Sequence, residues 1–209
     1  MAIRPAWTLK GGKVVREEFE FTWNGGFAIT QKQKNINGLH QAITNHTGER
    51  SLEISSKGTE ELGRNLSAFH LMLSDHHIEN IFQAAKKYEN VGPFSDLLDV
   101  EPKDAKRDIR HTTSGKLIAF IRDGDVWPLE PKTAFYDYIY VTAVCERYGF
   151  QLDLSQYQWF TDIEFNPKRS INCQARSVAI YKLLQNMNGF DAITGKDKWL
   201  QFHRECVVS

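Results

Sequence analysis

Residues 77–90 constrain the fold more than any other segment, because apolar residues recur there at helical spacing beside a polar stripe. Each residue of an α-helix advances by about 100°, so Glu79, Gln83 and Lys86 fall within roughly 60° of one another. The pattern predicts an amphipathic helix whose polar stripe faces either solvent or a cleft. Taken alone, these three side chains fit a solvated helix face better than a functional site. The apolar residues of the neighbouring arc are Ile78, Ile81, Phe82, Ala85 and Tyr88.

Helical and strand-like patterns alternate along the rest of the chain, and the helices outnumber the strands. We therefore predict an α+β fold, a mainly helical single domain with short strands. The strand-like segments are residues 13–23, 52–56, 158–165 and a hairpin at 116–127 that turns at Asp123-Gly124-Asp125. The other predicted helices are residues 27–45, 59–62, 93–98, 103–110, 132–148 and 170–187. Gly63 is expected to end the second of these and Ser170 to cap the last. The tail after residue 190 has no clear pattern.

Composition excludes several classes of protein. The chain has 209 residues, of which 41% are hydrophobic and 12% aromatic, so it can bury a substantial core. Lys plus Arg equals Asp plus Glu at 26 each, which argues against sequence-blind DNA binding but permits a nucleic-acid substrate in a local pocket. Three cysteines give no disulfide framework. No apolar segment is long enough for a membrane span, so we expect a cytoplasmic protein without membrane association.

Several short motifs have ordinary structural explanations. His76-His77 resembles a metal pair, but adjacent side chains point apart and no partner spacing follows, so we predict no metal site and no cofactor. Cys173, beside Asn172, is a candidate nucleophile. A buried structural cysteine is nevertheless the better interpretation of this residue. The basic run from Lys103 to His111 fits a solvated face, with contact to a DNA backbone as the alternative.

Motifs spread over residues 16–187 resemble the NADAR family. Glu79-x-x-Phe-Gln-Ala-x-Lys86-x-Tyr88 is similar to the family's helical signature, and Gly-Arg-Asn-Leu-Ser-Ala-Phe at 63–69 to the segment preceding it. Asn80, Ala68 and Tyr88 depart from the broad family pattern. The chain resembles one branch of this family more closely, the NADAR proteins encoded beside DarT-type DNA ADP-ribosyltransferase toxins. The segments that carry this resemblance are residues 31–36, 52–57, 127–132 and 170–176.

The resemblance implies an N-glycosidase, and this branch implies an antitoxin that removes ADP-ribose from guanine bases in DNA. Other members of the family act on a riboflavin precursor. The departures from the broad pattern argue against that substrate for this chain. The expected partners are ADP-ribosylated single-stranded DNA and the cognate DarT-type toxin. We expect residues 1–50 to form an N-terminal β/α extension packed on a NADAR-like catalytic domain at 51–209.

Cleavage of an N-glycosidic bond builds positive charge on the sugar, so we looked for two acidic groups. Glu79 is the first candidate. Glu164 or Asp162 is the second, and on the predicted strand these two share a face. If two carboxylates occupy an apolar cleft, one pKa rises and the acid and base roles separate.

A lysine offers another mechanism, because a desolvated amine can attack the anomeric carbon and form a Schiff base with the opened ribose. Lys86 is the first candidate for this role and Lys57 the second. The diphosphate and the bases need further groups, for which we expect small polar residues, helix N-termini and aromatic rings. The predicted substrate-binding residues are Ser56, Ser67, Phe69, Gln83, Trp127, Asn172, Gln174 and Arg176.

Two other functions stay open at this point. One is an N-glycosidase of a small nucleotide-like metabolite, and the other is a non-catalytic module that binds the toxin or ADP-ribose. The sequence does not choose between a Schiff base and direct attack by water. It also leaves open which carboxylate is the acid, the DNA sequence context, the oligomeric state and physical binding of the toxin.

Overall fold

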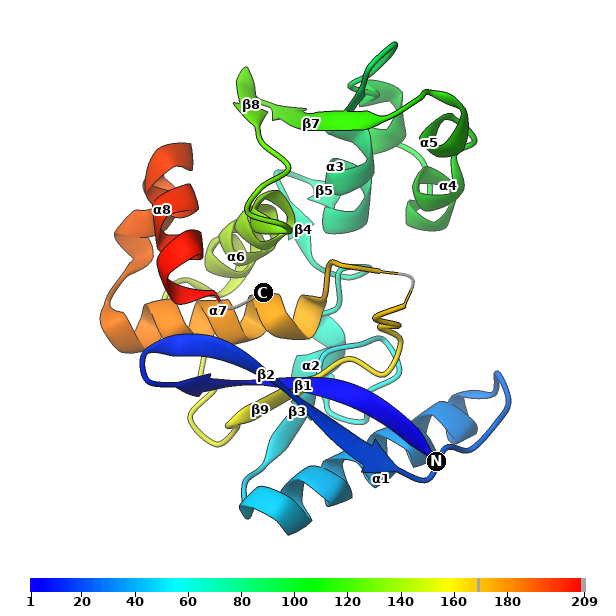
Figure 1. The fold of residues 1–209 in the computed structure, drawn as a ribbon, viewed down its shortest axis with the longest axis vertical. Helices are drawn as coiled ribbons and strands as arrows, with labels where there is room; N and C mark the ends of the chain where they lie inside the picture. Colours follow the sequence, from blue (N-terminus) through cyan, green and yellow to red (C-terminus); the bar gives the residue numbers. More distant parts are fainter. Residues whose placement is uncertain (169, 208–209) are drawn as a thin grey trace.

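The computed structural model describes residues 1–168 and 170–207. A four-stranded sheet of order β2-β1-β9-β3 organises the lower half of Figure 1. Strands β1 (Ala2–Lys10) and β2 (Lys13–Phe21) form an antiparallel hairpin. The Gly11-Gly12 loop suits this hairpin, because both residues have positive φ angles, 57° and 72°. Strand β9 (Trp159–Thr161) runs antiparallel to β1 and parallel to β3 (Ser51–Glu53).

Helices cover both faces of this sheet. Helix α1 (Ile29–Thr47) packs Ile36, Leu39 and Ile43 against one face, and Gly48 ends it with a left-handed φ of 74°. Helix α7 (Gln174–Met187) lies on the other face (Figure 1). The alternating helical and strand patterns of the sequence therefore produce a layered core around the sheet.

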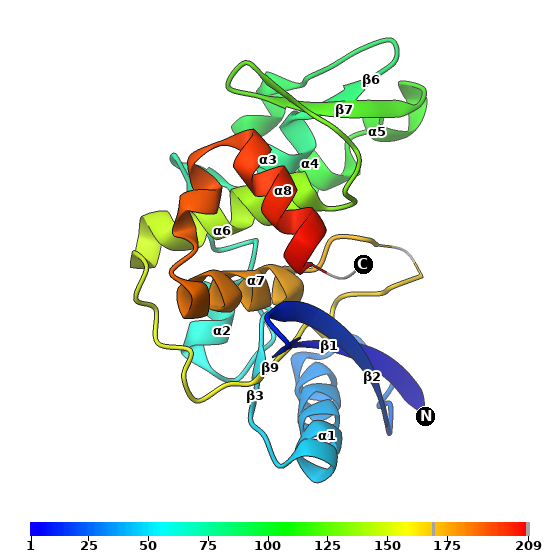
Figure 2. The same ribbon diagram turned by 60° about the vertical axis from the view of Figure 1, so that its left-hand side comes forward.

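A second layer of helices packs on α7. Helix α6 (Ala134–Tyr148) contacts α7 directly, and η2 (Phe190–Thr194) leads into α8 (Lys196–Cys206), which also contacts α6 (Figure 2). Trp199 of α8 is fully buried, and its indole N–H donates to the Ala134 carbonyl at 2.7 Å. The C-terminal helix is therefore part of the core.

The upper half of Figure 1 contains short elements around a second sheet of order β6-β7-β8. Its strands are β6 (Lys86–Tyr88), β7 (Leu117–Arg122) and β8 (Asp125–Trp127). The remaining elements are α2 (Glu61–Asn65), β4 (Met72–Leu73), β5 (His76–His77), α3 (Ile78–Ala84), η1 (Ser95–Leu98), α4 (Pro102–Arg107) and α5 (Arg110–Thr113). Within the described ranges, no helix combines the length and apolar character needed to cross a membrane.

The predicted α+β class is confirmed, as are the 116–127 hairpin and the end of α7 at Asn188. The helix predicted over 77–90 is wrong beyond Ala84. The Ala84 carbonyl accepts from the Phe94 amide and the Ala85 carbonyl from the Ile121 amide, both at 2.7 Å. These long-range bonds replace the helical ones, and the chain continues as β6.

Several other boundaries also differ from the predictions. The strand predicted over 158–165 ends at Thr161, and α7 begins after Cys173 instead of Ser170. Gly63 lies inside α2 and does not end a helix. The segments before residue 11 and after residue 195, where no element was predicted, form β1 and α8. The proposed subdivision at residue 50 stays a prediction, although β1, β2 and β3 belong to one sheet.

Gly63 provides a test of the packing between α2 and β3. A Cβ atom at this position would lie 2.0 Å from the Glu53 carbonyl oxygen, which is backbone and has little room to move. We expect Gly63→Ala to lower the free energy of unfolding by about 1–3 kcal/mol. Urea denaturation measures this change, with Gly25→Ala as the control because no atom lies within 4 Å of its added Cβ. Equal stability of the two variants would contradict the packing described here.

Candidate active site

A cavity of about 630 Å³ lies where the two halves of the molecule meet. Its walls come from α3, β6 and β7 on one side and from the segments that follow β9 and precede α7 on the other. Apolar and polar groups alternate along the lining, as in sites that bind small ligands. The lining therefore combines segments more than 80 positions apart, such as Glu79 and Asp162.

Three polar side chains form a hydrogen-bonded chain in one wall of this cavity. Gln83 Nε2 donates to Glu79 Oε1 at 2.7 Å, and Lys86 Nζ donates to Gln83 Oε1. Glu79 and Gln83 are one helical turn apart on α3 and are buried, with exposed fractions of 6% and 4%. Lys86 is on β6, but α3 ends so close to it that its ammonium group reaches back to Gln83. The three residues thus meet although they do not share a helix.

Burial makes Lys86 an unusual lysine. It lowers the pKa of the ammonium group to about 8, and the charge of Lys106 acts in the same direction while Glu79 opposes it. At neutral pH, a larger share of Lys86 is therefore the neutral amine than in an ordinary lysine. Lys106 Nζ also lies 3.8 Å from Glu79 Oε1. Glu79 is therefore close to the Lys106 amine and is connected to Lys86 through Gln83.

Asp162 contributes a buried carboxyl group from the opposite segment. Its Oδ1 accepts from the amides of Glu164 and Phe165 at 3.0 and 3.2 Å. Burial, followed by the charge of Glu53, raises the pKa of Asp162 well above its ordinary value. Both Glu53 oxygens accept hydrogen bonds, from Thr161 Oγ1 at 2.6 Å and the Ile163 amide at 2.8 Å. This arrangement favours Glu53 as the ionised member and Asp162 as the protonated one, a potential acid.

Glu164 differs from Asp162 although both line the cavity. Its side chain is 42% exposed and pairs with Lys32 of α1 at 3.0 Å. The prediction that both residues share a strand face is wrong, because β9 ends at Thr161. The Phe165 amide then donates to the Asp162 carbonyl at 3.1 Å, so the intervening residues form a turn. Asp162 is therefore buried in the cavity wall, whereas Glu164 is partly exposed to solvent.

Tyr136 of α6 is a cavity residue that the sequence analysis missed. It is 6% exposed, and burial raises the pKa of its hydroxyl well above the ordinary value, with further contributions from Glu79 and Asp162. The hydroxyl is therefore neutral and lies within the electrostatic reach of both carboxyl groups. Its place in an aromatic helix assigned to the core gave no separate signal. Other lining residues missed by the analysis include Phe82, Lys106, Phe120, Lys132 and Thr133.

Eight of the thirteen predicted site residues line the cavity, and their chemical roles stay predictions. These eight are Phe69, Glu79, Gln83, Lys86, Asp162, Glu164, Asn172 and Gln174. The other five lie elsewhere among the described residues, namely Ser56, Lys57, Ser67, Trp127 and Arg176.

Local structure explains the placement of these five. Trp127 is 2% exposed and packs its ring against Tyr138 at a centroid distance of 4.5 Å, so it is not placed to stack on a base. Ser67 is fully buried, and its carbonyl accepts from the next turn of the chain. Ser56 and Lys57 lie in the turn after β3, away from the cavity lining. Arg176 pairs with Asp137 at 3.0 Å.

Cys173 is a structural cysteine. It is 1% exposed, and burial followed by the charge of Asp162 raises the pKa of its thiol well above the ordinary value. The thiol is therefore protonated at neutral pH and is a poor nucleophile. Cys173 is also absent from the cavity lining, whereas Lys86 lines the cavity and has a lowered pKa.

A family model described as DarT1-associated NADAR antitoxin matches residues 2–208, almost the entire sequence. The comparison with curated proteins found no match.

The pKa of Lys86 tests the hydrogen-bonded chain. Because Glu79 raises this pKa against the effect of burial, Glu79→Gln should move it further below 8 while keeping an acceptor for Gln83. Competitive labelling of amines between pH 6 and 10, read by mass spectrometry, gives the midpoint for Lys86. An unchanged or raised midpoint in the folded variant would show that Glu79 does not act on Lys86.

Proposed function

The chain belongs to the DarT1-associated NADAR antitoxin family, and we propose that it acts as an N-glycosidase that removes ADP-ribose from guanine bases in DNA. Family membership accounts for the antitoxin role opposite a DarT1 toxin. The proposal adds the bond that is cleaved and the base from which ADP-ribose is released. A single observation carries it, namely the Glu79–Gln83–Lys86 chain in a cavity that also contains Asp162, a buried carboxyl group with a raised pKa.

The bond to be broken joins the anomeric carbon of the ribose to the exocyclic amine of guanine. Asp162 is suited to protonate this amine as it leaves, because its raised pKa keeps a proton available near neutral pH. Glu79 is suited to stabilise the positive charge that develops on the sugar, since its carboxylate is buried and held by Gln83.

The lowered pKa of Lys86 favours a covalent route over direct attack by water. In this route Nζ forms a bond to the anomeric carbon while the carbon–guanine bond breaks and Asp162 gives its proton to the base. Glu79 takes the proton lost by the amine and returns it to the ring oxygen as the sugar opens to the imine. Water then hydrolyses the protonated imine, which releases ADP-ribose and leaves Lys86 as an ammonium group. Return of its extra proton to Asp162 restores both residues to their starting states.

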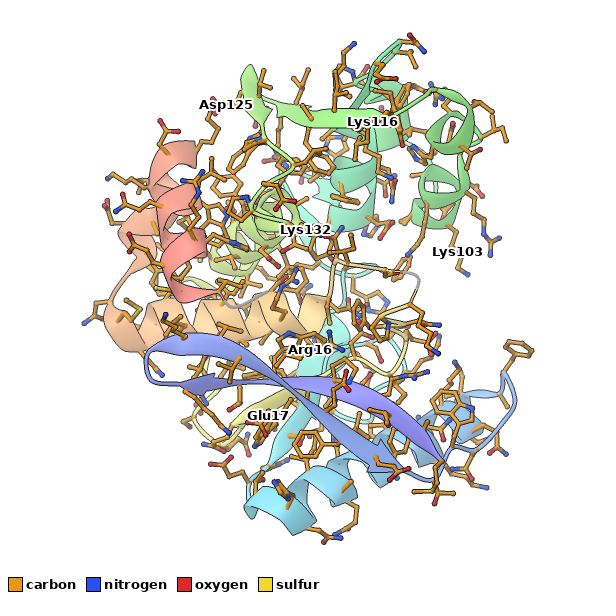
Figure 3. The ribbon with its side chains drawn as sticks, in the orientation of Figure 1. Arg16, Glu17, Lys103, Lys116, Asp125 and Lys132 are labelled. Atoms are coloured by element: carbon orange, nitrogen blue, oxygen red, sulfur yellow. The ribbon has the colours of Figure 1, made fainter. Side chains whose placement is uncertain are left out.

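Recognition of the DNA strand is proposed for the open side of the cavity. Lys103, Lys106 and Arg107 of α4 are exposed, and Lys106 also lines the cavity. Figure 3 shows Lys103 directed outward from this edge. Cations in this position can neutralise backbone phosphates on either side of a modified guanine, so binding can be local although the chain carries no net charge.

The activity test uses oligonucleotides that carry ADP-ribose on guanine or on thymine. We expect release of ADP-ribose from guanine, and a decrease of about 10²-fold or more in Glu79→Gln, because the charge on the sugar is no longer balanced. Single-turnover assays separated by chromatography measure the rate, and thermal unfolding checks the fold.

Glu61→Gln is the matched control, because it makes the same change on an exposed residue outside the cavity. Turnover by folded Glu79→Gln at the wild-type rate would remove Glu79 from the mechanism. Release from thymine but not guanine would overturn the proposed specificity, and turnover of free ADP-ribosyl metabolites alone would indicate a small-molecule glycosidase.

A further inference from the structure

A second pocket, of about 620 Å³, lies beside the cavity. The two hollows share lining residues, which come from the segment before α6 and the segment before α7. The two hollows therefore lie next to each other, on either side of these two segments. The shared residues are Glu130, Lys132, Thr133, Phe165, Ser170 and Ile171.

Cations dominate this second pocket, which we call the basic pocket. Its positively charged or protonatable lining residues are Arg16, Lys132, Arg176, His203 and Arg204. Glu130 is the one carboxylate among its described lining residues. Figure 3 shows that Arg16 and Lys132 come from different parts of the fold, the N-terminal hairpin and the segment before α6. Such a concentration of positive charge suits an anionic ligand.

The two most buried basic side chains of this pocket, Arg176 and His203, contact one buried acid. Arg176 Nη2 and His203 Nε2 each lie 3.0 Å from Asp137 Oδ2. Asp137 is fully buried, whereas Arg176 and His203 are 9% and 3% exposed. Arg176 Nε and His203 Nδ1 are buried without a hydrogen-bond partner in the described part of the chain. Such unpaired polar atoms cost stability unless another group reaches them.

Two helix N-termini add to the positive potential. Helix α6 begins after Thr133 and helix α7 after Cys173, and neither has a side-chain cap hydrogen bond. Thr133 and Ile171, which lie just before these helices, line both hollows. First-turn amides and the helix dipole favour anions, especially phosphate groups. The strongest attraction for phosphate is therefore expected where the two hollows meet.

We propose that the basic pocket binds the adenosine diphosphate part of the substrate, whose sugar lies in the neighbouring cavity beside Glu79 and Lys86. This inference rests on the proposed function and adds the site for the other end of ADP-ribose. A diphosphate matches the cations and helix N-termini at the junction. Phe165 and Val207 line the basic pocket and offer apolar contacts to an adenine base. A DNA strand must leave its site at both ends, so the open side near α4 suits it better.

The test measures binding of ADP by calorimetry in a double variant, Arg16→Ala/Arg204→Ala. Both residues are exposed, so their loss leaves the buried Asp137 cluster intact. We expect the affinity for ADP to fall at least tenfold, with a smaller loss for AMP and little loss for adenosine. Lys13→Ala/Lys198→Ala is the matched control, because it removes two exposed cations from the same strand and helix outside the pocket; its affinity should stay within twofold.

Two outcomes would overturn this assignment. One is ADP binding that is absent in the wild type or equal in both double variants. The other is a loss of affinity for an unmodified single-stranded oligonucleotide without a loss for ADP, which would make the pocket part of the DNA path.

Failure of the proposed function is distinguishable from failure of this inference. ADP binding that depends on Arg16 and Arg204, without turnover of modified DNA, would keep the pocket and reject the guanine glycosidase. Turnover of modified DNA with a KM that the double variant leaves unchanged would keep the guanine glycosidase and reject the basic pocket as the site for adenosine diphosphate. If both hold, the double variant should raise KM for the modified oligonucleotide more than it lowers kcat.

Discussion

The site depends on the early end of α3. Because the Ala84 and Ala85 carbonyls bond to Phe94 and Ile121, the helix stops and Lys86 enters a strand. A continued helix would carry Lys86 two turns beyond Glu79, about 10.5 Å along the axis. The observed path instead returns the ammonium group to Gln83, which in turn binds Glu79. Three polar residues of one short segment thus become a connected group that faces a cavity.

Burying a carboxyl group costs free energy unless it has ion-pair or hydrogen-bond partners, and the fold provides such partners. Asp137 pairs with Arg176 and hydrogen-bonds to His203, whereas Glu53 receives hydrogen bonds from Thr161 and the Ile163 amide. His40 donates to the Thr161 hydroxyl at 2.8 Å, and burial lowers its pKa to about 4, so it remains neutral. Glu53 and Asp162 are two buried carboxyl groups that act on each other, and burial together with the charge of Glu53 raises the pKa of Asp162 at the cavity.

Local patterns in the sequence predicted the α+β class, the 116–127 hairpin and the family, because each depends on short-range periodicity or motifs. They also selected Glu79, Gln83 and Lys86 for the same cavity, although the reason given, a shared helix, was wrong. Long-range hydrogen bonds decided where α3 and β9 end, and such bonds leave no local signal. Tyr136 was missed for a related reason, since an aromatic residue in a core helix and one in a cavity wall have the same pattern. The basic pocket joins residues 16 and 204, which no spacing rule connects.

The central claim is that the Lys86 amine attacks the sugar. Borohydride added during turnover of DNA carrying ADP-ribose on guanine reduces an imine to a stable amine, and mass spectrometry of peptides locates the adduct. The account predicts an ADP-ribosyl adduct on Lys86 and none on Lys57, which lies outside the cavity. Complete turnover under borohydride with no adduct on Lys86 would contradict it and would favour direct attack by water.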